Sequence, residues 1–137
     1  MTGLGTLTRR AARALAVGAV LALAGASASA APPEITPQEL AERLASEDPP
    51  LVLDVRSDGE WKGGHIPGAL HIPIDQLDAR RGEVPKDRDV VVHCQVAPRA
   101  RQAEKMLIMV GHERVFHLDG GFRGWSAAGL EVEKDAE

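Results

Sequence analysis

Short unbroken apolar runs alternate along the chain with longer stretches of helical periodicity. Residues 51–55, apart from Asp54, and residues 90–92 are apolar without alternation, as expected of strands covered on both faces. Residues 99–110 predict a helix with one face on the sheet, because small and apolar side chains recur three and four positions apart: Ala100, Ala103, Met106, Leu107 and Val110. We expect Met109 to lie in the core beside Met106.

Other segments complete an alternating order of strands and helices. Thr36, Pro37 and Glu39 together predict a helix start, with a capping threonine, a proline in the first turn and a glutamate three residues after the cap. We expect further helical segments at 57–62, 74–81 and 122–128, and strands at 70–72 and 114–118. This order predicts the α/β class, with a mostly parallel sheet of about five strands and helices on both faces.

The first thirty residues have the pattern of a signal peptide. Arg9, Arg10 and Arg13 precede an apolar stretch at residues 15–25, which is too short to span a bilayer comfortably. Small residues at 28–30 then form a typical cleavage site. We therefore expect export, to a periplasm or to the outside of the cell, with no stable membrane insertion after cleavage. An uncleaved membrane anchor is the alternative.

The rest of the chain is expected to form one domain at residues 35–132. Residues 31–34 are interpreted as a linker and residues 133–137 as a charged tail. Without the predicted signal peptide and its three arginines, 13 basic and 20 acidic residues give a net charge of −7. That charge argues against nucleic acid as a partner. The chain has no G-x-G-x-x-G or Walker A pattern, so we expect no nucleotide cofactor.

Cys94, the single cysteine, lies where the strand at 90–92 gives way to the helix at 99–110. Unpaired N–H groups and the dipole at a helix start favour the thiolate, which is the nucleophilic form. Sites in open α/β sheets form at the carboxyl ends of strands. In an oxidising compartment an unpaired thiol is also a candidate for reactivity. The alternative is a small buried apolar residue with no chemistry.

Taken in order, several short motifs of the chain resemble the rhodanese family of single-domain sulfurtransferases, over about residues 35–132. With its predicted signal peptide, the chain is also similar to the periplasmic phage-shock rhodaneses of bacteria. No single motif is decisive, but their order and spacing are specific: Leu53-Asp54-Val55-Arg56, Glu60-Trp61, Gly64-His65-Ile66-Pro67-Gly68-Ala69, Cys94 with Arg99, and Gly120-Gly121 with Trp125.

The resemblance implies a three-layer sandwich and a catalytic Cys94 that carries sulfur as a persulfide. The donor would be a small sulfur-containing anion such as thiosulfate, and the acceptor cyanide, a thiol or a protein dithiol. No metal or organic cofactor is implied. A loop of successive backbone N–H groups suits a sulfur anion. The expected loop residues are Gln95, Val96, Ala97, Pro98 and Arg99, and the expected supporting residues are Asp54, Arg56, His65 and Trp125.

The expected roles of these residues differ. Arg99 either orients the loop or meets the donor's anionic end, and a purely structural ion pair is the alternative. Asp54 and Arg56 are expected to support the neighbouring strand end. His65 and Trp125 are expected near the rim of the site. His65 and His71 do not form a metal site without further ligands.

The length of the loop distinguishes sulfur transfer from the chemistry of Cys-based phosphatases and arsenate reductases, and the shorter loop of this chain favours a single sulfur atom. Four residues separate Cys94 from Arg99, whereas the related Cys-based phosphatases and arsenate reductases have five and surround a tetrahedral anion. Two residues depart from the usual pattern. The family commonly has glycine where Ala97 stands, and a positive φ there would cost alanine about 1 kcal/mol. Pro98 removes one N–H group. A sulfur-carrier, redox-sensing or docking module with little turnover is therefore the second hypothesis.

Overall fold

The computed structural model describes Gly3 and residues 30–135 of the chain. The predicted signal peptide lies outside the described residues, apart from Gly3 and Ala30, and export stays a prediction. In the described part, no helix combines the length and the apolar character that a membrane crossing requires. The elements are β1 (Glu34–Ile35), α1 (Pro37–Leu44), β2 (Leu51–Asp54), α2 (Asp58–Lys62), β3 (Leu70–His71), η1 (Ile74–Gln76), α3 (Leu77–Arg80), η2 (Arg81–Glu83), β4 (Val90–His93), α4 (Pro98–Met109), β5 (Val115–Leu118) and α5 (Gly121–Ala127).

A five-stranded sheet in the order β1-β5-β4-β2-β3 forms the centre of the domain, and every neighbouring pair is parallel. The predicted α/β class is therefore confirmed. Because β4 is the middle strand, both of its edges are paired, and all four of its residues are buried. The carboxyl ends of parallel strands meet at one edge of the sheet, and β4 ends there directly before Cys94.

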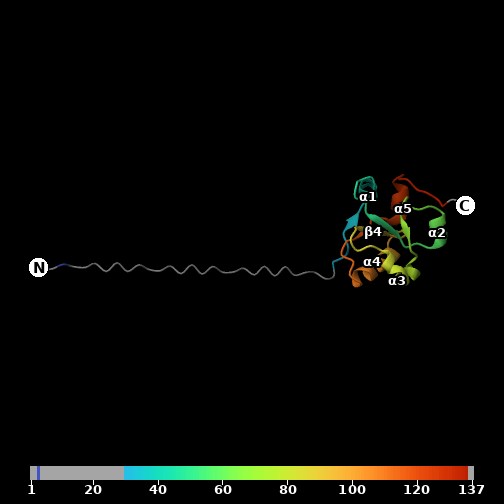
Figure 1. Cartoon of the computed structure of the whole chain (residues 1–137). Helices are drawn as coiled ribbons and strands as arrows, with labels where there is room; N and C mark the ends of the chain where they lie inside the picture. The colour runs from blue at the N-terminus through green and yellow to red at the C-terminus, as the bar shows by residue number, and fades with distance from the viewer. Residues whose placement is uncertain (1–2, 4–29, 136–137) are drawn as a thin grey trace. The chain divides into compact units, whose positions relative to one another are not determined.

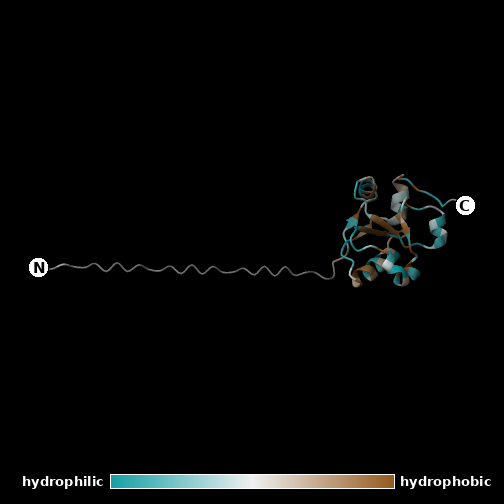
Figure 2. Cartoon of the chain, in the orientation of Figure 1, coloured by the Kyte–Doolittle hydropathy of each residue, from teal (hydrophilic) through white to brown (hydrophobic). Residues whose placement is uncertain are grey.

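Two hydrophobic clusters cover the two faces of the sheet. α3 and α4 lie on one face, where Leu77 and Leu107 pack against Leu53 and Val92. α1 and α5 lie on the other face. Figure 1 shows these two pairs of helices on opposite sides of β4. The strands between these layers are the most apolar segments of the domain (Figure 2). The second cluster is made of Ile35, Leu40, Val52, Ile66, Val91, Leu118 and Trp125.

Capping boxes begin two of the helices. Thr36 accepts a hydrogen bond from the Glu39 N–H, and the Glu39 side chain accepts one from the Thr36 N–H, as the sequence predicts. Ser57 and Glu60 form the same pair at the start of α2. α2 has only five residues, so this cap satisfies a large share of its free N–H groups.

Several boundaries differ from the sequence prediction. β1 begins at Glu34, inside the predicted linker, because its two residues pair with β5 at the sheet edge. The predicted charged tail is attached at its start, since Glu133 exchanges two backbone hydrogen bonds with His65. Met109 is 85% exposed, which makes its predicted core position wrong. It is in the last turn of α4, where the helix face turns away from the sheet.

The contribution of Trp125 to the core can be measured by truncation. Its side chain is 3% exposed and its indole Nε1–H donates to the Glu131 carbonyl at 2.8 Å. We expect Trp125→Ala to lower the free energy of unfolding by about 3–5 kcal/mol, because it leaves a cavity in the second cluster. Trp125→Phe, which keeps a ring but removes the hydrogen bond, should cost about 1–2 kcal/mol. Equal costs in denaturant unfolding would contradict this assignment.

Candidate functional site

Cys94 directly follows β4 at the carboxyl edge of the sheet. Its side chain is 1% exposed, forms no disulfide and packs in the hydrophobic cluster beneath α4. The next strand, β2, places Asp54 in register with His93 at the same edge. The thiol is thus surrounded by a fixed sheet edge and by the first turn of the twelve-residue helix α4.

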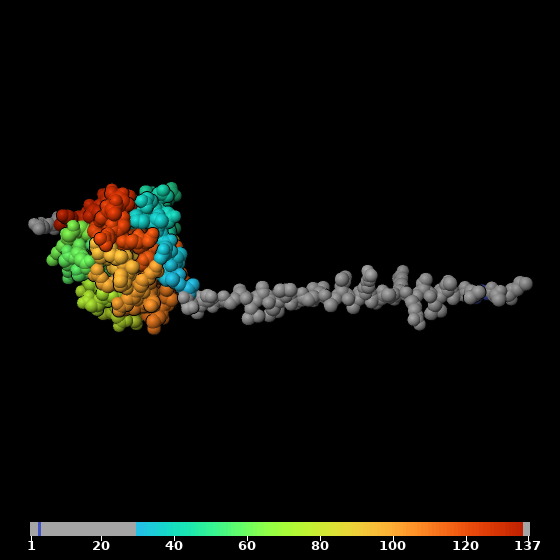
Figure 3. All heavy atoms as spheres, turned by 180° about the vertical axis from the view of Figure 1, so that it is seen from behind, coloured from blue at the N-terminus to red at the C-terminus, as the bar shows by residue number. Residues whose placement is uncertain are grey.

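Residues 94–99 form the Cys94 loop. The carbonyl groups at its start are directed at the beginning of α5. The Phe122 N–H donates to the Cys94 carbonyl at 2.9 Å, and the Arg123 N–H donates to the Gln95 carbonyl at 3.0 Å. A Cβ atom on Gly121 would lie 2.7–2.8 Å from the carbonyl oxygens of Val96, Cys94 and Gln95. Gly121 also has a φ of +59°, so only glycine suits this approach. Figure 3, which views the domain from behind, shows the orange-red surface of α5 next to the orange surface of the segment that contains the loop and α4.

The N–H groups of the same peptides face away from α5. In a trans peptide the N–H points opposite to the preceding carbonyl, and the described residues contain no cis peptide bond. Three carbonyls directed at Gly121 therefore turn the N–H groups of Gln95, Val96 and Ala97 to the other side of the loop. Within the described residues, neither these three N–H groups nor that of Arg99 donates to a protein acceptor. They are free to bind an anion.

The objections to Ala97 and Pro98 that the sequence raises do not apply in the structure. Ala97 has a φ of −155° and a ψ of −43°, so the positive φ considered from the sequence is not required there. Pro98 is the first residue of α4, a position where proline is common because its missing N–H would have had no partner within the helix. Neither residue therefore weakens the case for a functional loop.

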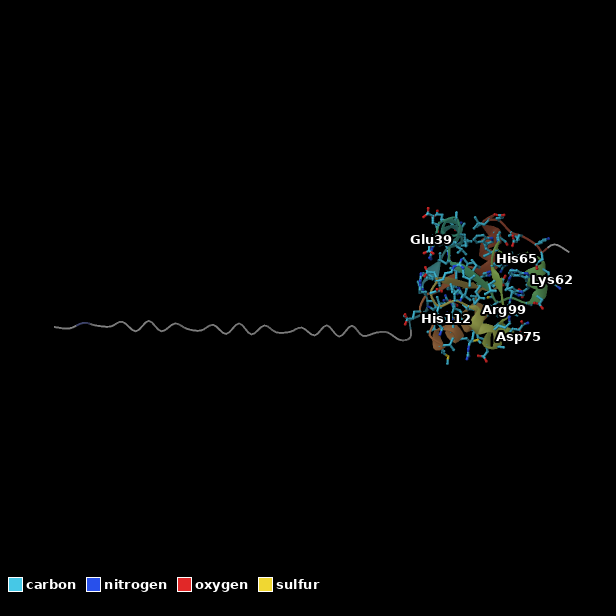
Figure 4. All side chains as sticks on the ribbon, in the orientation of Figure 1. Glu39, Lys62, His65, Asp75, Arg99 and His112 are labelled. Carbon is cyan, nitrogen blue, oxygen red and sulfur yellow. The ribbon has the colours of Figure 1, made fainter. Side chains whose placement is uncertain are left out.

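Arg99 forms a two-pronged ion pair with Glu60 of α2. Its Nη1 and Nη2 atoms lie 2.6 and 2.9 Å from the two carboxylate oxygens. The hydrogen bonds from Arg99 outweigh partial burial and lower the pKa of Glu60 from 4.5 to about 2, so the carboxylate stays ionised in the neutral range. This ion pair joins α4 to α2. Figure 4 labels Arg99 on its ribbon.

Asp54 and Arg56 form a second, fully buried ion pair. Arg56 donates to Asp54 through Nε, Nη2 and its backbone N–H, at 2.8–3.1 Å. Burial acts to raise the pKa of Asp54, but the hydrogen bonds from Arg56 and the neighbouring positive charge keep the pKa below its usual value. Arg56 also donates to the Gly64 carbonyl at 2.8 Å and lies 4.0 Å above the ring of Phe122. Its Nη1 reaches the Gln95 side chain at 3.5 Å. The pair therefore connects β2 to the loop and to α5.

His65 and Trp125 do not take part in the loop. His65 is buried, stacks on Trp61 with ring centroids 3.5 Å apart, and places Nδ1 3.1 Å from the Trp61 carbonyl. His71 also stacks on Trp61, with ring centroids 4.6 Å apart. Trp125 is a core residue of the cluster under α1 and α5, which corrects its expected place near the rim. These residues support the fold around the site.

Sequence reasoning did not assign a role to His93. The ring is fully buried, and its Nδ1 atom lies 3.0 Å from the Cys94 carbonyl oxygen. Burial lowers the pKa of His93, although the Asp54 charge acts in the opposite direction, so the ring is neutral at physiological pH. The available signal was a polar residue inside an apolar strand, directly before the cysteine. For Gly121, the sequence indicates only one half of a Gly-Gly turn and no contact with the loop.

The chemistry open to this site is that of a thiol beside free N–H donors. Within the part of the chain that the structure covers, no group of three or more His, Cys, Asp or Glu side chains could hold a metal ion. Arg56 and Arg99 are each paired with a carboxylate. An anion formed on the Cys94 sulfur would thus be stabilised by backbone dipoles.

Known proteins match this arrangement. Residues 36–128 match the rhodanese-like domain. A sulfurtransferase of Allochromatium vinosum is 39% identical over 99 residues, covering 72% of this chain and 92% of the relative. The thiosulfate sulfurtransferase GlpE of Glaesserella parasuis is 33% identical, covering 73% of this chain and 92% of the relative. The HTH-type transcriptional regulator Rv0324 of Mycobacterium tuberculosis is 40% identical, and the chain spans about half of it, 52%.

Solved structures agree. A rhodanese-like domain protein from Staphylococcus aureus superposes with a TM-score of 0.69 at 28% identity, covering 76% of this chain and 99% of that one. The matching segment includes every element from α1 to α5, and with them Cys94, its loop and the glycine turn that approaches it. On the sheet order, the loop geometry and these matches, the chain belongs to the rhodanese family.

Proposed function

We propose that the protein is a sulfurtransferase that carries sulfane sulfur on Cys94. Sulfur transfer in general follows from the family, and the named relatives include sulfurtransferases. The observation that carries the specific proposal is the set of free N–H groups beside the thiol, on Gln95, Val96, Ala97 and Arg99. A persulfide anion needs such donors, because in a buried site no water replaces them.

The proposed reaction has two steps. The Cys94 thiolate attacks the outer sulfur of a donor such as thiosulfate, and a bond forms between the two sulfur atoms. The sulfur–sulfur bond of thiosulfate breaks, and sulfite leaves with the electron pair. A nucleophile then attacks the terminal sulfur of the persulfide. Cyanide gives thiocyanate, a thiol gives a new persulfide, and the Cys94 thiolate is restored in both cases.

Several features support a small sulfur ligand. The loop is held to α5 through two consecutive carbonyls, and its far end is held by the Arg99–Glu60 side-chain pair, so its width is restrained at both ends. Because Glu60 neutralises Arg99, the charge of the bound sulfur is balanced by N–H dipoles and the start of α4. Those donors are preorganised, so they stabilise the anion without being reordered during the reaction.

The direct test is the mass of the protein after exposure to thiosulfate. We expect wild type to gain about 32 Da, one sulfur atom, as a persulfide. Adding cyanide should remove that mass and release thiocyanate. Cys94→Ser, which keeps nearly the same size, should show neither change. An unmodified wild-type protein would contradict the proposal and leave a docking role, while an adduct that no acceptor removes would favour a carrier.

Gly121→Ala tests whether the loop geometry is needed. The new Cβ would lie within 2.8 Å of three carbonyl oxygens, so the loop must move and its N–H groups lose their common direction. We expect persulfide formation to slow by roughly tenfold or more, since one displaced donor to an anion is already worth that factor. The rate of mass gain with thiosulfate measures this.

Gly129→Ala is the matched control. Gly129 has a φ of +71°, but no atom lies within 4 Å of an added Cβ. It should cost only the backbone strain, about 1–2 kcal/mol of stability, with an unchanged rate of persulfide formation. If the two variants slowed the reaction equally, the contact between Gly121 and the loop would not be what matters.

A further inference from the structure

We propose that His93 is a positioning residue, whose Nδ1–H holds the Cys94–Gln95 peptide so that the Gln95 N–H faces the sulfur. This inference rests on the proposed function for its purpose. It stands on geometry that no other part of the reaction requires: a fully buried ring with Nδ1 3.0 Å from the Cys94 carbonyl oxygen.

The contact determines which ring nitrogen carries the proton. A carbonyl oxygen only accepts hydrogen bonds, so Nδ1 must be the donor. The other nitrogen, Nε2, is then an acceptor in the neutral ring. It is the one buried side-chain polar atom without a partner among the described residues. The closest carboxylate oxygen, on Asp54, is 3.7 Å away and already accepts from Arg56.

That unpaired nitrogen argues against a purely structural role. A buried polar atom without a hydrogen bond is destabilising, and an apolar residue of similar size would avoid the cost. The preceding inward positions of β4 and β2 on this face, Val91 and Val52, are apolar, and Asp54 opposite His93 is already paired with Arg56. A histidine at position 93 is therefore useful for the bond that its other nitrogen makes.

The same carbonyl receives a second donor from a different element. The Phe122 N–H of α5 donates to the Cys94 oxygen at 2.9 Å, so both of its lone pairs are used. Phe122 alone would leave the peptide plane free to swing about that bond. Two donors from two directions fix the plane, and the trans geometry then fixes the direction of the Gln95 N–H. Gln95 supplies the first N–H after the nucleophile.

Three substitutions separate positioning from packing. His93→Asn places an amide N–H close to the Nδ1 position. His93→Gln is nearer in size but its amide extends toward the Nε2 position, and His93→Leu has no donor. Each variant is compared by its rate of Cys94 alkylation with iodoacetamide at slightly acidic pH, by kcat and KM with thiosulfate and cyanide, and by its unfolding free energy.

We expect His93→Asn to be alkylated and to turn over about tenfold faster than His93→Gln and His93→Leu, because it alone keeps the donor. Stability should follow a different order, with His93→Gln at least as stable as His93→Asn, since it leaves the smaller cavity. Alkylation rates that follow stability, or that are equal in all three variants, would overturn the inference.

The alkylation readout is independent of sulfur transfer. If wild type forms no persulfide but the alkylation order holds, the proposed function fails and the positioning role remains. If sulfur transfer is present and His93→Leu matches wild type in both rates, the positioning role fails and the function remains.

Discussion

The close approach of Gly121 to three successive carbonyl oxygens of the Cys94 loop is the contact on which the site depends. A side chain at that position would occupy the space of the oxygens, and the positive φ would be strained for any residue but glycine. The approach directs the carbonyls toward α5, and peptide geometry then directs the N–H groups to the opposite side. The direction of the loop's N–H groups is thus determined largely by a residue outside the loop.

Two ion pairs keep that loop in place from the β2 side. The Asp54–Arg56 pair is fully buried, and Arg56 extends to Gln95 and the Phe122 ring. The Arg99–Glu60 pair joins α4 to α2. Breaking the buried Asp54–Arg56 pair by removing one partner is costly, so this pair holds β2 against the loop and the start of α5. The guanidinium groups of Arg56 and Arg99 are thus paired with carboxylates, whereas the backbone N–H groups of the loop have no protein acceptor.

The sequence predicted the fold because its signals are local. Unbroken apolar runs, helical spacing and the cap at Thr36 each depend on a few neighbouring residues, and the parallel sheet follows from their alternation. It also predicted Cys94 at a strand-to-helix junction. It could not show that Arg99 pairs with Glu60 or that Ala97 keeps a negative φ. Each depends on residues distant in sequence, and β1 forms only because β5 lies beside it.

Binding of the Cys94 sulfur anion by the N–H groups of Gln95, Val96, Ala97 and Arg99 can be measured through the proton and nitrogen chemical shifts of these backbone amides, recorded with and without sulfur loading. We expect these amide protons to move downfield together in the loaded protein, and none to move in Cys94→Ser treated in the same way. Loaded wild-type protein in which these amides keep their positions, while other residues shift, would contradict it.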